Sequence, residues 1–336
     1  MHGWIILDKP LGLGSTQGVS AVKRVLRQGG YGKGIKVGHG GTLDPLATGV
    51  LPIAVGEATK LAGRMLDSDK VYDFTIRFGE QTSTLDAEGE VVATSDVRPT
   101  RAALEAVLPR FTGPIDQVPP AYSALKVDGE RAYDLARAGE EVVLASRAVT
   151  IHSLQSSPER GGGPFASANG GGGAPLGESP AEAPLHPQPA AGGPPPRAGE
   201  DLSEITLTAH VSKGTYIRSL ARDIALALGS VGHVTMLRRT KAGPFTLAPA
   251  ISLDKLNEMG QARTLEQILL PLRAGLDDIP ALALDPDQAG ALRQGRVLVG
   301  IAVDDGQYFA MLGENPVALV EALDANVRVV RGFNLD

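Results

Sequence analysis

The sequence predicts a mixed α+β fold with a largely antiparallel sheet, followed by a small β-rich module at the C-terminal end. Residues 71–78 (VYDFTIRF) alternate between apolar and polar side chains, and segments with helical periodicity lie between such runs. Near 273–280 the pattern changes to short strand-like runs, which indicates the separate module. The chain has 336 residues, enough for about two domains of roughly 150 residues each.

Three helices are expected in the larger part. Residues 15–28 carry an apolar stripe, and Ser15 or Thr16 is the candidate N-cap. Residues 100–108 form a second helix, whose first residue is a threonine suited to capping. Residues 217–228 form a third helix that follows directly on a strand-like run. The strand order of the sheet does not follow from these patterns.

A low-complexity segment interrupts the larger part at residues 156–203. It contains 11 Gly and 10 Pro among its 48 residues, and one aromatic residue. Such a composition buries too little apolar surface to offset the entropy of ordering, so we expect disorder there. Because strand-like runs at 148–154 and 205–211 flank it, the segment is interpreted as an insertion in a hairpin loop.

The C-terminal module is expected to hold one short helix and several strands. Residues 285–295 have helical character, and the strand candidates lie at 296–301, 307–312 and 327–333. The predicted domains are therefore a catalytic domain at 1–272, with its insertion, and a module at 277–336.

Charge is unevenly distributed along the chain. The net charge is −6, but residues 277–336 alone hold four Arg and ten acidic residues. Between Asp8 and Asp44 every charged residue is basic, among them Lys9, Lys23 and Arg24. Such a basic stretch suits a polyanionic partner, although solvated helix faces and loops would look the same.

Composition excludes several classes of protein. The chain has no Cys, so it has neither disulfides nor thiolate metal sites. No apolar run approaches the roughly 18–20 residues that span a bilayer. With six His and no Cys, the sequence offers little from which to build a metal centre, and it contains no phosphate loop or zinc helix motif. We therefore expect a cytoplasmic protein that uses neither metal nor cofactor and has no membrane partner.

A single acidic residue, Asp44, stands out within residues 38–60 (GHGGTLDPLATGVLPIAVGEATK). Pro45 restricts the backbone of Asp44 to extended or turn conformations, and the glycines before it permit a close approach or unusual dihedral angles. A carboxylate held at a loop tip suits nucleophilic attack. The alternative is an Asx-turn acid that bonds only its own backbone.

Other candidates lie elsewhere in the sequence. Arg218 and Arg222 are spaced to share one face of a helix, where either could keep Asp44 ionised or simply be exposed to solvent. Tyr72 lies on the apolar face of its strand, so it either packs in the core or stacks on a base. His39 is either a loop histidine bonded to the backbone or a wedge in a nucleic-acid stack.

The stretch 38–60 resembles the Asp-bearing motif of the bacterial tRNA pseudouridine-55 synthase family. Further segments resemble that family's other motifs in their order along the chain: 5–12 (IILDKPLG), 67–90 (DSDKVYDFTIRFGEQTSTLDAEGE), 117–139 (QVPPAYSALKVDGERAYDLARAG), 212–218 (SKGTYIR) and 233–239 (HVTMLRR). The resemblance covers nearly all of 3–155 and 204–272. It implies a catalytic domain of the pseudouridine synthase type and a small β-barrel-like, PUA-like RNA-binding module.

The resemblance also implies an activity. A uridine at position 55, in the T-arm loop of tRNA, would be isomerised to pseudouridine after the base flips out of its stack. The implied catalytic residues are Asp44, Tyr72 and Arg218. His39 would fill the gap in the RNA stack, and Leu237 would line the pocket. Basic residues would bind RNA phosphates, namely Lys9, Lys23, Arg24 and Arg238. We expect a monomer whose partner is the tRNA T-arm.

Two alternatives remain open at this stage. The chain could be a pseudouridine synthase that acts on another RNA, such as ribosomal RNA, or one that an accessory RNA guides. It could also be a tRNA-binding or tRNA-folding protein without catalysis. The acidic balance of 277–336 departs from the family pattern, and so does the insertion at 156–203.

Overall fold

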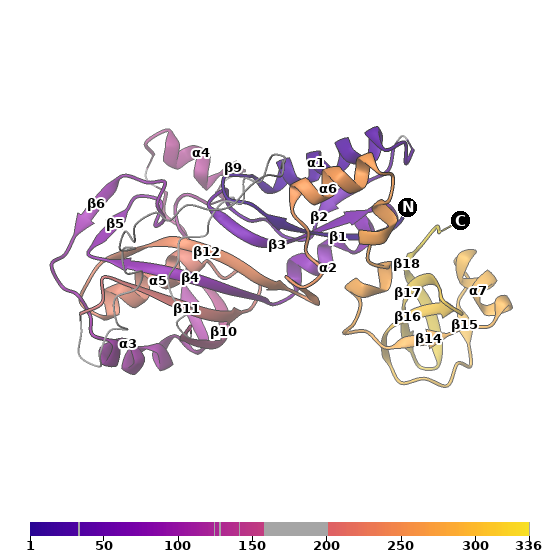
Figure 1. Cartoon of the computed structure of the whole chain (residues 1–336). Helices are drawn as coiled ribbons and strands as arrows, with labels where there is room; N and C mark the ends of the chain where they lie inside the picture. Colours follow the sequence, from indigo (N-terminus) through magenta and orange to yellow (C-terminus); the bar gives the residue numbers. More distant parts are fainter. Residues whose placement is uncertain (33, 124, 128, 141, 158–200, 336) are drawn as a thin grey trace, which may run out of the picture.

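The structure is a computed structural model that describes residues 1–32, 34–123, 125–127, 129–140, 142–157 and 201–335. Figure 1 shows an elongated molecule in which a long twisted sheet forms the body and a smaller sheet lies at one end. The body is mixed α+β, which confirms the predicted fold class.

The main sheet has nine strands within the described residues, in the order β1-β3-β12-β4-β11-β10-β7, with β2 beside β3 and β13 beside β12. The strands are β1 (Gly3–Lys9), β2 (Val37–His39), β3 (Ala47–Val55), β4 (Lys70–Phe78), β7 (Gly113–Gln117), β10 (Arg147–Ser156), β11 (Glu204–Val211), β12 (Gly232–Ala242) and β13 (Phe245–Thr246). Only the short β3–β12 pairing is parallel among these pairs, so the sheet is largely antiparallel, as predicted.

Helices cover the sheet at its two halves (Figure 1). Helix α1 (Ser15–Gln28) packs with α6 (Leu253–Gln261) over the β1–β3 end, through apolar residues such as Val22 and Leu256. Helices α5 (Ile217–Ala227) and α3 (Arg101–Val107) cover the β4–β11 end, where Leu220 and Leu104 pack with Phe74. The smaller elements are α2 (Ala62–Asp67), α4 (Ala132–Arg137), β5 (Glu80–Thr82), β6 (Val91–Thr94), β8 (Lys126–Val127) and β9 (Glu130–Arg131).

The three predicted helices are confirmed, but one of their caps is wrong. Thr100 caps α3 by accepting the N–H of Ala103. Helix α1 has Gly14 rather than Ser15 or Thr16 at its N-cap. The Ser15 hydroxyl instead donates to the Leu43 carbonyl at 2.9 Å and accepts the Leu43 N–H at 2.8 Å. The serine is therefore used in a tertiary contact with the loop that carries Asp44, which the local sequence does not reveal.

The C-terminal module is a curled five-stranded sheet with one helix (Figure 1). Its elements are β14 (Ala281–Ala283), α7 (Pro286–Arg293), β15 (Leu298–Val299), β16 (Gly306–Leu312), β17 (Asn315–Leu323) and β18 (Asn326–Gly332). The predicted helix and the three predicted strands are present. The sequence pattern predicts neither β14 nor the central strand β17, in which Pro316 obscures the strand pattern.

The module packs on the body through a shared apolar core. Phe309 and Phe333 belong to the same cluster as Trp4, Leu61 and Met65 of the body. Polar contacts surround this core, including the ion pair between Arg64 and Asp278 at 2.9 Å. The division into 1–272 and 277–336 stays a prediction, because the apolar core continues across the junction.

The flanks of the predicted insertion are ordered. Strands β10 and β11 are antiparallel neighbours, as predicted, and their pairing includes Ser156 with Leu207. The Leu202 side chain is buried, and Asp201 forms an isolated antiparallel β-bridge with Thr100. Residues 156, 157 and 201–203, which the composition predicts to be disordered, therefore have a defined structure. The remainder of the segment, 158–200, lies outside the described residues.

Within the described part of the chain, no helix is both long enough and apolar enough to cross a bilayer. The cytoplasmic location stays a prediction.

Candidate active site

The loop that carries Asp44 joins β2 to β3 and is fixed by backbone contacts. The Asp44 carbonyl accepts the N–H of Ala47 at 3.0 Å, and the Pro45 carbonyl accepts the N–H of Gly12 at 2.9 Å. Gly41, just before it, adopts φ +133°, a conformation that favours glycine. Hydrogen bonds from Ala47 and Gly12 therefore fix the backbone of the loop, which gives the Asp44 carboxylate a defined position.

Two buried cations, Arg239 and Lys9, donate hydrogen bonds to backbone carbonyls of this loop. Arg239 is 1% exposed and donates to the carbonyls of Val50, Thr42 and Gly41. Lys9 is 0% exposed and donates to the Pro45 carbonyl at 3.2 Å and to the Leu13 carbonyl at 2.6 Å. Burial lowers the pKa of Lys9 to about 8, although Asp44 opposes the shift.

The burial of Lys9 argues against the phosphate contact predicted for it, although that role stays untested. A phosphate contact requires an ammonium at the surface, whereas this one is enclosed by main-chain carbonyls. Its bonds are those of a residue that positions the Asp44 loop. The sequence analysis did not identify Arg239 as part of the site, because an arginine in a strand gives no sign that it will be buried.

Arg218 lies beside Asp44. Its Nη2 atom is 2.9 Å from Asp44 Oδ2, and the Arg218 side chain is 7% exposed while that of Asp44 is 46% exposed. The same guanidinium donates to the carbonyls of Thr84 at 2.8 Å and Tyr122 at 3.0 Å. These contacts fix the guanidinium, so the carboxylate has a positioned charge partner and still faces solvent. Arg222 instead pairs with its neighbour Asp223 at 2.8 Å.

A second carboxylate, Asp86, completes this ion-pair network. Asp86 Oδ2 is 3.2 Å from Arg218 Nη1, and the Asp86 side chain is 9% exposed. Its other oxygen accepts the Thr84 hydroxyl at 2.5 Å and the Glu88 N–H at 3.0 Å. Arg218 therefore connects an accessible acid to a buried one. Sequence reasoning missed Asp86; its turn-like surroundings mark a structured loop but do not indicate the distant arginine.

A cavity of about 190 Å³ opens beside the network. Its lining includes Asp44, Tyr72, Arg218 and Leu237. Tyr72 also lines an adjoining cavity of about 160 Å³. The structure thus brings the three predicted catalytic residues and Leu237 around one concave surface. Their catalytic and binding roles stay predictions.

The remaining predicted site residues do not line this cavity. His39 lies on β2, and its Nδ1 atom is buried without a hydrogen-bond partner among the described residues. Burial and the nearby charge of Arg239 lower the pKa of His39, so the ring is neutral near pH 7. Lys23 and Arg24 are exposed on α1, whereas Arg238 is partly buried and pairs with Asp8 at 2.8 Å.

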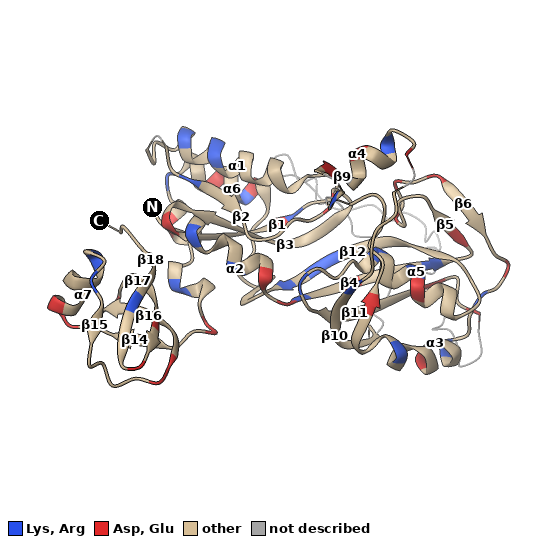
Figure 2. Ribbon diagram, turned by 180° about the vertical axis from the view of Figure 1, so that it is seen from behind, with Lys and Arg blue, Asp and Glu red and all other residues tan. Residues whose placement is uncertain are grey.

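Figure 2 shows several basic residues along α1 and several acidic residues on the C-terminal module, while both signs of charge occur over the rest of the body. Lys23 and Arg24 are exposed basic residues of α1.

Comparison with known families gives two matches. Residues 23–159 match the TruB family pseudouridylate synthase (N terminal domain), and residues 218–277 match the tRNA pseudouridylate synthase B C-terminal domain. Together they account for more than half of the chain.

Curated relatives match over the whole length. A tRNA pseudouridine synthase B of Novosphingobium aromaticivorans is 63% identical over 335 residues, which is 100% of this chain and 98% of the relative. Another, of Zymomonas mobilis subsp. mobilis, is 54% identical over 336 residues and covers 99% of this chain and 96% of the relative.

Solved structures share the fold at lower identity. The archaeal box H/ACA sRNP Nop10-Cbf5 complex has a chain with a TM-score of 0.65 and 21% identity, covering 99% of this chain and 86% of that one. A Cbf5-Nop10-Gar1 complex gives a TM-score of 0.63 at 23% identity, with 96% and 78% covered. The family matches, the full-length relatives and the fold agree, and the chain belongs to the TruB family of pseudouridylate synthases.

Proposed function

We propose that the chain isomerises a uridine of tRNA to pseudouridine, with Asp44 as the catalytic carboxylate. The observation that carries the proposal is the contact between Asp44 and Arg218, at 2.9 Å, at the rim of a cavity that Tyr72 also lines. Full-length relatives named tRNA pseudouridine synthase B support tRNA as the substrate.

The reaction moves a base without adding atoms to it. The C1′–N1 bond breaks, the uracil turns within the cavity, and C5 bonds to C1′. N1 gains a proton and C5 loses one, so substrate and product are isomers. Asp44, accessible and fixed by its loop, attacks the sugar or assists cleavage of the glycosidic bond. The Arg218 guanidinium orients this carboxylate.

The other side chains are suited to holding the flipped nucleoside. Tyr72 presents an aromatic ring on which the uracil stacks, and Leu237 supplies an apolar wall. His39, neutral near pH 7, takes the place of the absent base in the RNA stack. Exposed Lys23 and Arg24 contact phosphates. The substrate position is uridine 55 in the T-arm loop, and the enzyme acts as a monomer in the cytoplasm.

Replacement of Asp44 by Asn tests the proposal. The Asp44→Asn variant should form no pseudouridine in a tRNA transcript, because an amide is neither a nucleophile nor a charge partner for an oxocarbenium-like sugar. Its affinity for the same tRNA should stay within about tenfold of the wild type, because the phosphate contacts remain. Pseudouridine mapping by primer extension and filter binding measure the two quantities.

Two controls separate the alternatives. A transcript with cytidine at position 55 should remain unmodified by the wild type, and ribosomal RNA fragments should also remain unmodified. Modification at another position of the transcript would contradict position 55 as the target. Full turnover by Asp44→Asn would show that Asp44 is not a catalytic residue.

A further inference from the structure

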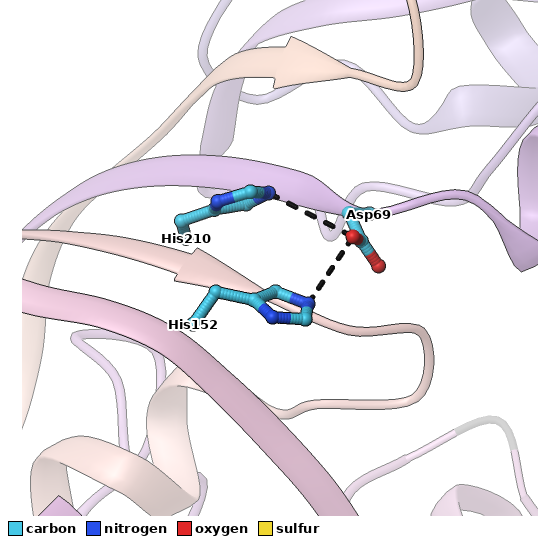
Figure 3. Close-up of side chains that lie close together, drawn as sticks. All are labelled: Asp69, His152 and His210. Atoms are coloured by element: carbon cyan, nitrogen blue, oxygen red, sulfur yellow. Dashed lines mark ion pairs between the residues drawn. The ribbon is translucent and has the colours of Figure 1, made fainter. Parts of the chain in front are cut away.

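A cluster of three side chains of types that can bind a metal lies on the opposite face of the sheet from the proposed active site. Tyr72 pairs with Ala209 on the face that α5 covers, and Ala209 and Val211 are both buried. His210 lies between these two residues and therefore points to the other face. Figure 3 shows His210, His152 and Asp69 directed toward one another there.

Irregularities of the strands bring the three side chains together. The register between β10 and β11 shifts between Ile151 and Ser153, so that His152 occupies a bulge and has no direct cross-strand partner. Asp69 immediately precedes β4, and its carbonyl accepts the N–H of Gly243 at 2.9 Å. The cluster thus joins β10, β11 and the start of β4. The backbone of His210 is fixed by strand pairing, and that of Asp69 by the hydrogen bond from Gly243.

The distances suit a small divalent ion. Asp69 Oδ2 is 3.1 Å from His152 Nε2 and 3.8 Å from His210 Nε2. All three ligand atoms lie within 4.8 Å of one another. Zinc bound at about 2.0–2.1 Å in tetrahedral geometry separates its ligand atoms by about 3.4 Å. Small rotations of the partly exposed imidazoles would bring all three pairs to that spacing.

Asp69 and His152 are exposed and His210 is half-buried, so a hydrated ion can reach the three ligand atoms from solvent. Asp69 and His210 also line an open cavity of about 530 Å³ with Asp67 and Asp278, so a hydrated cation has a route to the ligands.

From this geometry we propose that Asp69, His152 and His210 form a binding site for a divalent transition-metal ion, of which Zn²⁺ fits best. Two imidazoles and one carboxylate are a common ligand set for zinc and leave a fourth position for water. The ion would tie the β10–β11 hairpin to the start of β4. This site is independent of the proposed function, since none of its residues lines the Asp44 cavity.

Calorimetric titration of the full, untagged chain with Zn²⁺ after chelator treatment tests the proposal. The wild type should bind one ion with a dissociation constant of the order of 10 µM or lower, and its Tm should rise with zinc concentration. Cobalt as a probe should give the visible absorption of a tetrahedral site.

Variants assign the binding to these residues. Asp69→Asn and His210→Ala should each weaken zinc binding about tenfold or more, because three ligands are the minimum for a tight site. Asp67→Asn is the matched control: it removes an equal charge nearby, breaks the exposed pair with Lys213, and should leave affinity within about twofold.

Two outcomes would overturn the proposal. The first is the absence of stoichiometric zinc binding by the wild type, which would leave Asp69 and the histidines as a simple ion-pair cluster. The second is unchanged binding in both Asp69→Asn and His210→Ala, with both variants folded by circular dichroism, because the zinc would then lie elsewhere.

Discussion

At the scale of single residues, Arg218 is the point on which the candidate site depends. It is almost fully buried and makes ion pairs with both Asp44 and Asp86. A buried charge without its partner destabilises the folded state, and this holds for the Arg218 guanidinium as well as for the Asp86 carboxylate. Removal of Arg218 would therefore affect the stability of the fold as well as the position of Asp44.

Replacement of Arg218 by Ala should lower the rate of pseudouridine formation about 100-fold or more. It should also lower the free energy of unfolding by about 3 kcal/mol, because Asp86 loses its buried partner. Single-turnover rates well below the Tm separate the two effects, and urea unfolding gives the second. Arg218→Lys should keep most of the stability but recover little activity, since lysine lacks the planar fork that reaches both acids.

Arg222→Ala is the control for Arg218, because Arg222 lies one turn along α5 and pairs with its neighbour Asp223. Its rate should stay within about twofold of the wild type. Equal losses in the two variants would indicate that α5 contributes only general surface charge.

At the scale of elements, the start of β4 depends on a buried lysine. The Lys70 ammonium donates to the carbonyls of Leu66 and Ser68 at the end of α2. Burial lowers the pKa of Lys70 to about 8, and the nearby Arg239 adds to the shift, against the opposing effects of Asp67 and Asp69. The fold therefore holds a cation that would be better solvated in the unfolded chain.

This shift gives a prediction for alkaline pH. Between pH 8 and about 10.4, the unfolded state keeps the Lys70 proton while the folded state loses it. The free energy of unfolding of the wild type, relative to that of Lys70→Met, should therefore rise by about 1–2 kcal/mol from pH 8 to 10.5. Denaturant unfolding of both proteins across this range measures the difference. A constant or falling difference would contradict the buried ammonium.

At the scale of the whole molecule, helix α1 and the C-terminal module carry charge of opposite sign. The body exposes basic residues on α1, while the module at 277–336 has four Arg against ten acidic residues. A polyanion approaching the Asp44 cavity is therefore attracted by the body and repelled by the module, unless the module's few basic side chains face it.

The double variant Lys23→Ala, Arg24→Ala should bind tRNA about tenfold more weakly, and the slope of log affinity against log salt should fall by about 1–2. The double variant Arg293→Ala, Arg296→Ala removes two exposed charges from the acidic module and should change neither quantity appreciably. Filter binding over a range of salt concentrations measures both. The reverse ranking would place the RNA on the module.

The sequence by itself determined the main helices and the motif that carries Asp44. Periodicity identified the helices at 15–28, 100–108 and 217–228, because each buries one face against a sheet. The Gly-rich, proline-flanked setting of Asp44 indicated either a fixed nucleophile or an Asx-turn acid, and the family resemblance favoured the nucleophile. These are local signals, carried by spacing within a few residues.

Only the tertiary structure decided which distant residues meet. The pairing of Arg218 with Asp44 and Asp86, the burial of Lys9, and the approach of Asp69, His152 and His210 all depend on sheet order and register. Local pattern records the face on which a side chain lies, but not the strand or loop that faces it. That choice is made by the packing of the whole sheet, including the bulge at His152, whose position no periodicity encodes.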